Sequence, residues 1–252
     1  MATHPPGPLT GKVALVTGAA RRVGATIAHA LHDAGADVLL HFRSSSEACT
    51  ALAAELNAVR PNSAVTAEAD LLDLGQLQGL PSAATAAFGG LDIVVNNAST
   101  FYPTPVGDIT EIDWNDLLGT NVKAPLFLAQ AAQAALRARQ GLIVNIADIH
   151  GMRPLRRHPV YSIAKSAMIM LTRSLARELG PDIRVNAVAP GPVMWPEDGM
   201  DAALQKEIIE RTALKRSGSP GDVARTVLFF ATEARFITGQ ILAVDGGRSI
   251  GW

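Results

Sequence analysis

Residues 13–24 read VALVTGAARRVG, a short apolar run that leads into a turn containing Gly18 and Gly24. An apolar run that stops at a turn signal is typical of a strand buried on both faces. Gly18 permits a tight turn, and Gly24 lets a following helix pack closely against the strand. The N-terminus of that helix presents free backbone N–H groups, which bind phosphate. Because the turn follows the first buried strand, we interpret the stretch as a dinucleotide-binding site rather than as an ordinary strand-to-helix turn.

The rest of the chain alternates between apolar runs and helical patterns. Strands are predicted over residues 13–17, 38–41, 65–69, 91–96, 142–146, 183–188 and 241–244. Helices are predicted over residues 23–34, 47–60, 74–88, 114–139, 160–179, 201–212 and 222–230, with Pro125 bending the fourth or marking a boundary inside it. This alternation predicts an α/β fold, a single doubly wound Rossmann-type domain with a mainly parallel seven-stranded sheet and helices on both faces. Ligands of such sheets bind beyond the carboxyl ends of the strands.

Composition and length limit the possible classes of function. The chain has 252 residues, 48% of them hydrophobic and 18% charged, which suits one globular domain over residues 11–252. We expect a flexible leader over residues 1–10 and a small substrate lid around residues 191–218. A net charge of -1 gives no general attraction to nucleic acid or membranes. With a single cysteine, no metal-ligand cluster, no signal peptide and no spanning run, we expect a soluble cytoplasmic protein with a small-molecule substrate.

The segments after the second and third strands indicate which dinucleotide binds. NAD enzymes usually place an acid after the second strand for the ribose hydroxyls, but this chain has none there. Arg22 and Arg43 instead supply guanidinium groups suited to a 2′-phosphate, and Ser44 adds a hydroxyl donor. The sequence therefore favours NADPH. Asp70 follows the third strand, where it is placed either for an adenine contact or for a helix cap before Leu71.

A tyrosine and a lysine lie one helical turn apart in the predicted helix 160–179. Tyr161 and Lys165, at i and i+4, share a helix face. A nearby ammonium favours the phenolate and lowers the pKa of a tyrosine, and it can also hold the nicotinamide ribose. The pair can therefore transfer a proton while a bound cofactor transfers a hydride.

These motifs, in this order and spacing, resemble those of the short-chain dehydrogenase/reductase family. The resemblance rests on the glycine turn, on residues 96–98 (NNA), on Asn121, on the Tyr161/Lys165 pair and on residues 190–191 (PG), and it spans roughly residues 10–250. It implies that Tyr161 donates a proton, that Lys165 binds the ribose and lowers the tyrosine pKa, and that Asn121 supports a helix kink and a proton-relay water. The expected cofactor contacts are Gly18, Arg22, Val23, Arg43, Ser44, Asp70, Leu71, Asn97, Ala98, Ser99, Tyr161, Lys165, Pro190 and Gly191.

Three departures from the general family pattern resemble its pteridine reductase branch. Asp148 stands thirteen residues before the tyrosine, where the general family has a serine, and Arg22 stands where many members have a glycine. Phe101 lies in the loop after the fourth strand. The resemblance implies that this ring stacks on a pterin, which lies between it and the nicotinamide. It also implies that Tyr161 serves reduction of the oxidised pterin, while Asp148 with water helps protonate the dihydro form.

The chemistry of a pterin suits these side chains. A carbonyl substrate needs hydroxyl donors, whereas reduction of a ring C=N bond needs a proton on the ring nitrogen, which a carboxyl group near Tyr161 can pass. That carboxyl group can also accept hydrogen bonds from an amino-pyrimidine edge, and Phe101 offers a flat apolar face. The expected substrate contacts, with Asp148, Tyr161, Lys165 and Asn121 as catalytic residues, are Ser99, Phe101, Asp148, Tyr161 and Trp195. Trp195 either closes over the ring or packs the lid down.

Three functions are compatible with the sequence. The one we favour is an NADPH-dependent pteridine reductase that converts oxidised or dihydro pterins, with dihydrofolate as a candidate, toward the tetrahydro form. The alternatives are a generic NADPH-dependent carbonyl or 3-oxoacyl thioester reductase, in which Asp148 merely caps a loop, and a dinucleotide-binding protein without activity. The intact Tyr161/Lys165 pair argues against the last. Family members are commonly tetramers paired through their long helices and last strand, so a homotetramer is expected. Residues 114–139 and 160–179 are apolar enough to form such an interface, although core packing explains their composition too.

Overall fold

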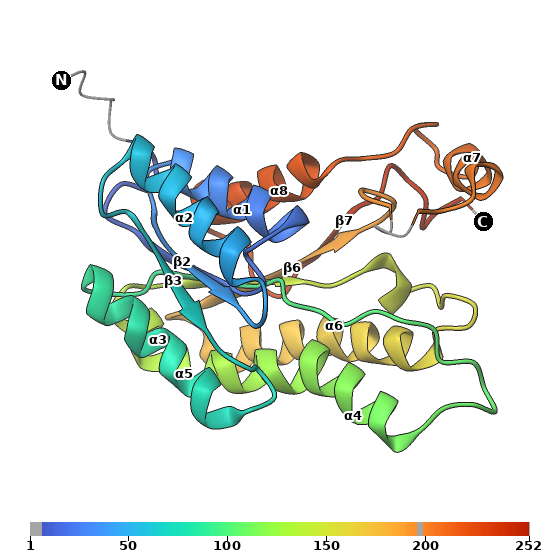
Figure 1. Cartoon of the computed structure of the whole chain (residues 1–252), viewed down its shortest axis with the longest axis horizontal. Helices are drawn as coiled ribbons and strands as arrows, with labels where there is room; N and C mark the ends of the chain where they lie inside the picture. The colour runs from blue at the N-terminus through green and yellow to red at the C-terminus, as the bar shows by residue number, and fades with distance from the viewer. Residues whose placement is uncertain (1–6, 196–198, 252) are drawn as a thin grey trace.

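A seven-stranded sheet forms the centre of the protein, seen here in a computed structural model that describes residues 7–195 and 199–251 (Figure 1). The strands are β1 (Val13–Val16), β2 (Asp37–Phe42), β3 (Ala64–Glu68), β4 (Ile93–Asn96), β5 (Leu142–Ile146), β6 (Arg184–Pro190) and β7 (Ile241–Val244). Their order is β3-β2-β1-β4-β5-β6-β7, and every neighbouring pair is parallel. The predicted doubly wound α/β fold is confirmed. The winding reverses between β1 and β4, where such sheets bind ligands.

Helices cover both faces of the sheet. On one face lie α1 (Arg22–Asp33), α2 (Ser46–Val59) and α8 (Pro220–Thr232); on the other lie α3 (Leu74–Phe88), α5 (Ala124–Ala138) and α6 (Pro159–Leu179) (Figure 1). Successive residues of β1 enter two different cores, because Ala14 and Val16 pack toward α1 and α8, whereas Leu15 packs toward α3 and α5. This arrangement explains why the strand is apolar at every position rather than at alternate ones.

The long helix predicted over residues 114–139 is divided in the structure. It consists of α4 (Glu111–Leu118), a π-helical turn at Gly119–Lys123, and α5. The first part begins earlier than predicted because Thr110 and Asp113 form a capping box with reciprocal hydrogen bonds. Pro125 lies in the first turn of α5, so it marks an inner boundary, where its missing N–H is tolerated.

The ends and the lid refine the predicted domain limits. Leu9 is buried, and its backbone N–H donates to the carbonyl of Ala34 over 2.9 Å, so residues 7–10 pack on the domain although we expected them in a flexible leader. The apolar side chain of Leu9 explains the difference, since burial stabilises it against the core. The rest of that leader, residues 1–6, and residues 196–198 of the lid lie outside the described residues. Residues 191–218, where we expect a substrate lid, include α7 (Ala202–Glu210) at one end of the molecule (Figure 1).

Two absences apply to residues 7–195 and 199–251. No helix there is long and apolar enough to cross a membrane. The same residues contain no group of histidine, cysteine, aspartate and glutamate side chains that is suited to hold a metal ion.

Candidate active site

A cavity of about 910 Å³ lies at the carboxyl ends of the strands. All the predicted site residues line it except Asn121. They are Gly18, Arg22, Val23, Arg43, Ser44, Asp70, Leu71, Asn97, Ala98, Ser99, Phe101, Asp148, Tyr161, Lys165, Pro190, Gly191 and Trp195. The structure thus brings the cofactor candidates and the catalytic candidates into one cavity, because parallel strands place all their following loops at the same edge of the sheet.

The turn after β1 is built so that only glycine fits at two positions. Gly18 has a φ of +61°, and a Cβ atom there would lie 3.0 Å from the Cα atom of Ala98. A Cβ atom on Gly24 would lie 2.2 Å from the carbonyl oxygen of Gly18. The side chain of Asn97 donates to the carbonyl oxygens of Thr17 and Gly18, at 2.9 and 3.0 Å. The turn is therefore held tightly against the loop after β4, and the N-terminus of α1 faces the cavity.

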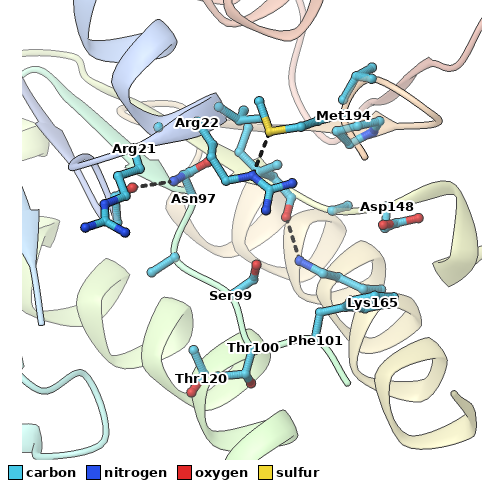
Figure 2. Close-up of a pocket in the computed structure, with 18 of the residues that line it drawn as sticks. Arg21, Arg22, Asn97, Ser99, Thr100, Phe101, Thr120, Asp148, Lys165 and Met194 are labelled. Carbon is cyan, nitrogen blue, oxygen red and sulfur yellow. Dashed lines mark hydrogen bonds between the residues drawn. The ribbon is translucent and has the colours of Figure 1, made fainter. Parts of the chain in front are cut away.

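The two arginines of this turn point in different directions. Arg22 has a φ of +56°, which is uncommon for a residue with a side chain and turns its guanidinium group across the cavity. There it contacts the lid, with Nε on the sulfur of Met194 and Nη2 donating to the carbonyl of Trp195 over 3.0 Å (Figure 2). Arg21 leaves on the opposite side and lines the cavity together with Arg43 (Figure 2). The guanidinium group of Arg22, for which we expected a 2′-phosphate role, therefore faces residues 194–195.

The end of the cavity formed by β2 and β3 is suited to a phosphorylated dinucleotide. His41 is buried: its Nδ1 atom accepts from the N–H of Gly18 over 3.1 Å, and its Nε2 atom lies 3.0 Å from the carbonyl oxygen of Ala69. Asp70 accepts a hydrogen bond from the backbone N–H of Leu72 over 2.9 Å, so it shapes the turn before α3 as well as lining the cavity. The residues after β2 that line the cavity carry no carboxylate, and they are Arg43, Ser44 and Ser45. Guanidinium and hydroxyl donors without an acid fit a 2′-phosphate.

The catalytic end is centred on a hydrogen bond between Tyr161 and Asp148. The tyrosine hydroxyl donates to Oδ2 of Asp148 over 2.9 Å. The other carboxylate oxygen accepts from the backbone N–H of His150 over 2.8 Å. Asp148 therefore does both of the things considered from the sequence, since it caps the loop after β5 and also reaches the tyrosine. The proton of the Tyr161 hydroxyl is therefore directed at the Asp148 carboxylate.

Lys165 lies beneath the tyrosine and is fully buried. Figure 2 shows Lys165 at the cavity, with a hydrogen bond from its Nζ atom. This bond runs to the carbonyl of Ile146 over 3.0 Å, and Nζ lies 5.6 Å from the centre of the Tyr161 ring. Burial lowers the pKa of Lys165 to about 8. The pKa of Tyr161 is raised well above its usual value by burial and by Asp148. This direction is opposite to the one expected from Lys165, because the group in hydrogen-bond contact with the hydroxyl is a carboxylate rather than the ammonium.

Asn121 lies in the π-helical turn, behind the wall of the cavity. Its Nδ2 atom donates to the carbonyls of Thr100 and Leu117, at 3.0 and 2.9 Å. Its Oδ1 atom is buried, and none of the described residues donates to it. The Asn121 side chain thus links the π-helical turn to the loop after β4. Its buried Oδ1 atom remains able to accept a further hydrogen bond.

Phe101 is held beside the tyrosine by aromatic contacts. Its ring meets Tyr161 edge-on, with centroids 4.7 Å apart, and stacks on His158 at the same separation with planes 8° apart. The Phe101 side chain is 51% exposed. The loop that carries it is anchored by Thr104, whose N–H donates to the carbonyl of Arg157 over 2.7 Å. An exposed aromatic ring held in one orientation is suited to stack on a planar ligand.

Several residues of the site were not predicted from the sequence. Arg21 and His41 line the cofactor end, His158 supports Phe101, and Arg248 lines the cavity from the segment after β7. Arg248 donates to the carbonyl of Ile208 over 3.3 Å, near the end of α7. A histidine at the end of a buried strand, as in His41, is the one signal that could have been used, since such a side chain needs polar partners.

Comparisons with known proteins agree with this arrangement. Residues 18–249 match the family model described as enoyl-(acyl carrier protein) reductase. Pteridine reductase 1 of Leishmania tarentolae is 38% identical over 99% of each chain. The 3-oxoacyl-[acyl-carrier-protein] reductase FabG of Staphylococcus aureus is 34% identical over 94% of this chain and 97% of the other.

A solved structure is similar along almost the whole chain. The blue fluorescent protein from a metagenomic library, in complex with NADPH, is 37% identical to this chain, covering 96% of it and 99% of the other protein, with a TM-score of 0.89. The chain therefore belongs to the short-chain dehydrogenase/reductase family and is an NAD(P)-dependent oxidoreductase.

Proposed function

We propose that the protein is an NADPH-dependent pteridine reductase that converts oxidised or dihydro pterins, or dihydrofolate, toward the tetrahydro form. The observation that carries the proposal is the hydrogen bond between Tyr161 and the carboxylate of Asp148, 2.9 Å long, next to the exposed ring of Phe101. A relative that is 38% identical over 99% of this chain carries the name pteridine reductase 1, which supports it.

The substrate would be recognised by its flat ring and by its amino-pyrimidine edge. Phe101 is held by His158 and offers aromatic surface beside Tyr161. The Asp148 carboxylate lies within hydrogen-bond distance of the tyrosine hydroxyl, and it can accept hydrogen bonds from the N–H groups of an aminopyrimidine. Ser99 lines the same wall, and Trp195 comes from the lid. These groups select a planar, nitrogen-rich ring over a simple ketone.

The proton needed at the ring nitrogen would come from the hydroxyl of Tyr161. Burial and the neighbouring carboxylate raise the pKa of this tyrosine, so the hydroxyl keeps its proton until an acceptor other than Asp148 is presented. NADPH supplies the hydride when it is bound. Lys165, whose Nζ atom lies 5.6 Å from the centre of the Tyr161 ring, would hold the ribose and stabilise negative charge left on the phenol oxygen. The buried Oδ1 atom of Asn121, to which none of the described residues donates, suits a water that returns a proton to the site.

The choice of NADPH rests on guanidinium groups that line the cavity. Arg21 comes from the turn after β1, and Arg43 follows β2 together with Ser44; the cavity-lining residues directly after β2 carry no carboxylate. The structure that is 37% identical to this chain was solved in complex with NADPH, which supports the same choice.

A 3-oxoacyl thioester reductase is the second candidate. The family model described as enoyl-(acyl carrier protein) reductase and the 34% identical FabG of Staphylococcus aureus favour it. The carboxylate of Asp148 argues against it, because a substrate carbonyl oxygen at Tyr161 would meet an acceptor where it needs a donor.

One experiment separates the two candidates. We would follow NADPH oxidation by absorbance with dihydrobiopterin and with an acetoacetyl thioester, for the wild type, Asp148→Asn and Asp148→Ser. For a pteridine reductase, we expect pterin turnover to fall by about 100-fold in both variants, because the carboxylate that takes part in proton transfer is lost. Asparagine has nearly the same shape as aspartate, so its effect reports the loss of the carboxylate rather than a change in packing. Activity on the thioester alone, retained or raised by serine, would establish the carbonyl reductase instead.

The proposed homotetramer is supported by exposed apolar side chains on the long helices. Trp114 in α4, Leu126 in α5, and Ile163 and Met170 in α6 are all exposed. Exposed apolar side chains in adjacent helices suit a surface that pairs with a second copy.

A further inference from the structure

His41, which has no part in hydride or proton transfer, binds the phosphate-binding turn twice. Its side chain accepts from the N–H of Gly18 over 3.1 Å, and its backbone carbonyl accepts from the next N–H, that of Ala19, over 2.9 Å. On its other side the ring reaches the carbonyl of Ala69 over 3.0 Å, at the end of β3. One residue of β2 thus connects the turn after β1 to the end of β3, at the cofactor end of the cavity.

These contacts select one form of the imidazole ring. Nδ1 accepts from a backbone N–H, so it carries no proton, and the neutral ring must carry its proton on Nε2. That Nε2–H faces the carbonyl of Ala69, which is an acceptor only. A doubly protonated ring would point an N–H at the N–H of Gly18. It would therefore lose the hydrogen bond that holds the turn.

We propose that neutral His41 is a positioning residue that fixes the phosphate-binding turn, and that protonation of its ring weakens cofactor binding. The inference concerns the proposed NADPH site and does not depend on the identity of the substrate. Two N–H groups of the turn are bound by His41 and cannot also bind phosphate. The backbone N–H groups at the start of α1 remain available to bind phosphate. The hydrogen bond between His41 and Gly18 fixes the turn that leads into α1 and so sets the direction of these N–H groups.

The surroundings of the ring favour the neutral form. His41 is 2% exposed, and burial lowers its pKa below the usual value, against opposing contributions from the Ala69 hydrogen bond and from Asp70. Arg43, which directly follows β2, and Glu68 on β3 are exposed to solvent. The ring is therefore uncharged near neutral pH and takes up a proton only in more acidic solution, where the Gly18 contact is lost.

The test is the dissociation constant of NADPH, measured by fluorescence titration without substrate from about pH 8 to about pH 5. The variants are His41→Asn, whose side-chain oxygen can replace Nδ1 as acceptor and does not titrate, and His41→Leu, which has nearly the same shape without an acceptor. At about pH 7 to 8 we expect His41→Leu to bind NADPH about tenfold more weakly, because the N–H of Gly18 loses its partner. We expect His41→Asn to bind within about threefold of the wild type.

The pH dependence separates titration of the ring from titration of the ligand. The 2′-phosphate itself gains a proton near about pH 6, but it does so identically for all three proteins. Between about pH 7 and pH 5 the wild type should therefore lose about three- to tenfold more affinity than His41→Asn. Parallel curves for these two proteins would overturn the role of protonation.

The positioning role has its own decisive result. A His41→Leu variant that binds NADPH as tightly as the wild type would overturn the positioning role. Thermal unfolding shows whether each variant protein is folded. If His41→Leu does not fold, the comparison of the wild type with His41→Asn across pH still decides the inference. A protein that binds NADPH as described but reduces no pterin would leave the inference standing and remove the proposed substrate.

Discussion

The two ends of the cavity are held together by different kinds of interaction. At the cofactor end, neutral groups hold the turn after β1, namely the amide of Asn97 and the imidazole of His41. At the catalytic end, ionisable groups contact one another in a buried space: Tyr161 donates to Asp148, and Lys165 lies beneath the tyrosine ring.

The difference follows from what each end has to do. A site that receives phosphate needs N–H donors of constant direction and constant charge, which neutral partners provide. A site that moves a proton needs groups whose protonation state changes, and burial shifts their pKa values. Lys165 shows that this arrangement costs stability. Burial disfavours its charged form and lowers its pKa to about 8 in the folded protein. Three substitutions test this division, and two of them act at the catalytic end.

The largest effect is expected for Tyr161→Phe. It removes the hydroxyl that donates to Asp148 while leaving the ring that packs against Phe101. We expect kcat to fall by about 10³-fold, because a general acid contributes roughly 10² to 10⁴ in rate. The dissociation constant of NADPH should change by less than about twofold, since the hydroxyl is not a phosphate contact. Full turnover in this variant would mean that another group donates the proton.

Lys165→Met should make the cofactor-free protein more stable and inactive. The folded pKa is about 8 and the unfolded value is 10.5, so the unfolded state binds more protons between these pH values. The buried ammonium therefore destabilises the folded state. This destabilisation is complete below about pH 8, lessens as the pH rises, and is absent above 10.5. The difference of about 2.5 pKa units corresponds to about 3 kcal/mol.

The gain should be smaller than this limit, because the variant also leaves the carbonyl of Ile146 without its donor. We expect the free energy of unfolding at about pH 7 to rise by about 1 to 3 kcal/mol, measured by urea denaturation without cofactor. The gain should shrink when the measurement is repeated above pH 8. A loss of stability at neutral pH would show that the lysine hydrogen bond outweighs its desolvation.

The smallest effect is expected at the cofactor end, for Arg43→Ala. If Arg43 binds the 2′-phosphate as proposed, removing its guanidinium group should weaken NADPH binding by about tenfold and leave NADH binding nearly unchanged. Arg22→Ala is the matched control, since the guanidinium of Arg22 contacts Met194 and Trp195 of the lid. We expect that variant to change the substrate KM more than the ratio of NADPH to NADH affinity. An equal loss of both cofactors in Arg43→Ala would mean that the 2′-phosphate is recognised elsewhere.

Local patterns in the sequence were sufficient for the fold and for part of the site. The apolar run of β1 is buried on both faces, and Gly18 and Gly24 lie where a side chain would collide with backbone. Tyr161 and Lys165 share one face of α6, as their spacing predicted. The apolar run and the Tyr161/Lys165 spacing are local patterns, which the periodicity of strands and helices determines. The collision at Gly18 is with Ala98, so the local pattern marks the turn but not its partner.

The tertiary structure decided everything that depends on the meeting of distant segments. His41 reaches Gly18 across 23 positions of the chain, and the left-handed backbone of Arg22 directs its guanidinium group to a lid 172 residues away. The raised pKa of Tyr161 follows from burial and from the orientation of the Asp148 carboxylate. The sequence by itself determined which chemical groups are present at the edge of the sheet. Only packing decided which of them touch and which charge each tends to carry, because hydrogen bonds and desolvation depend on distances of a few ångströms between side chains.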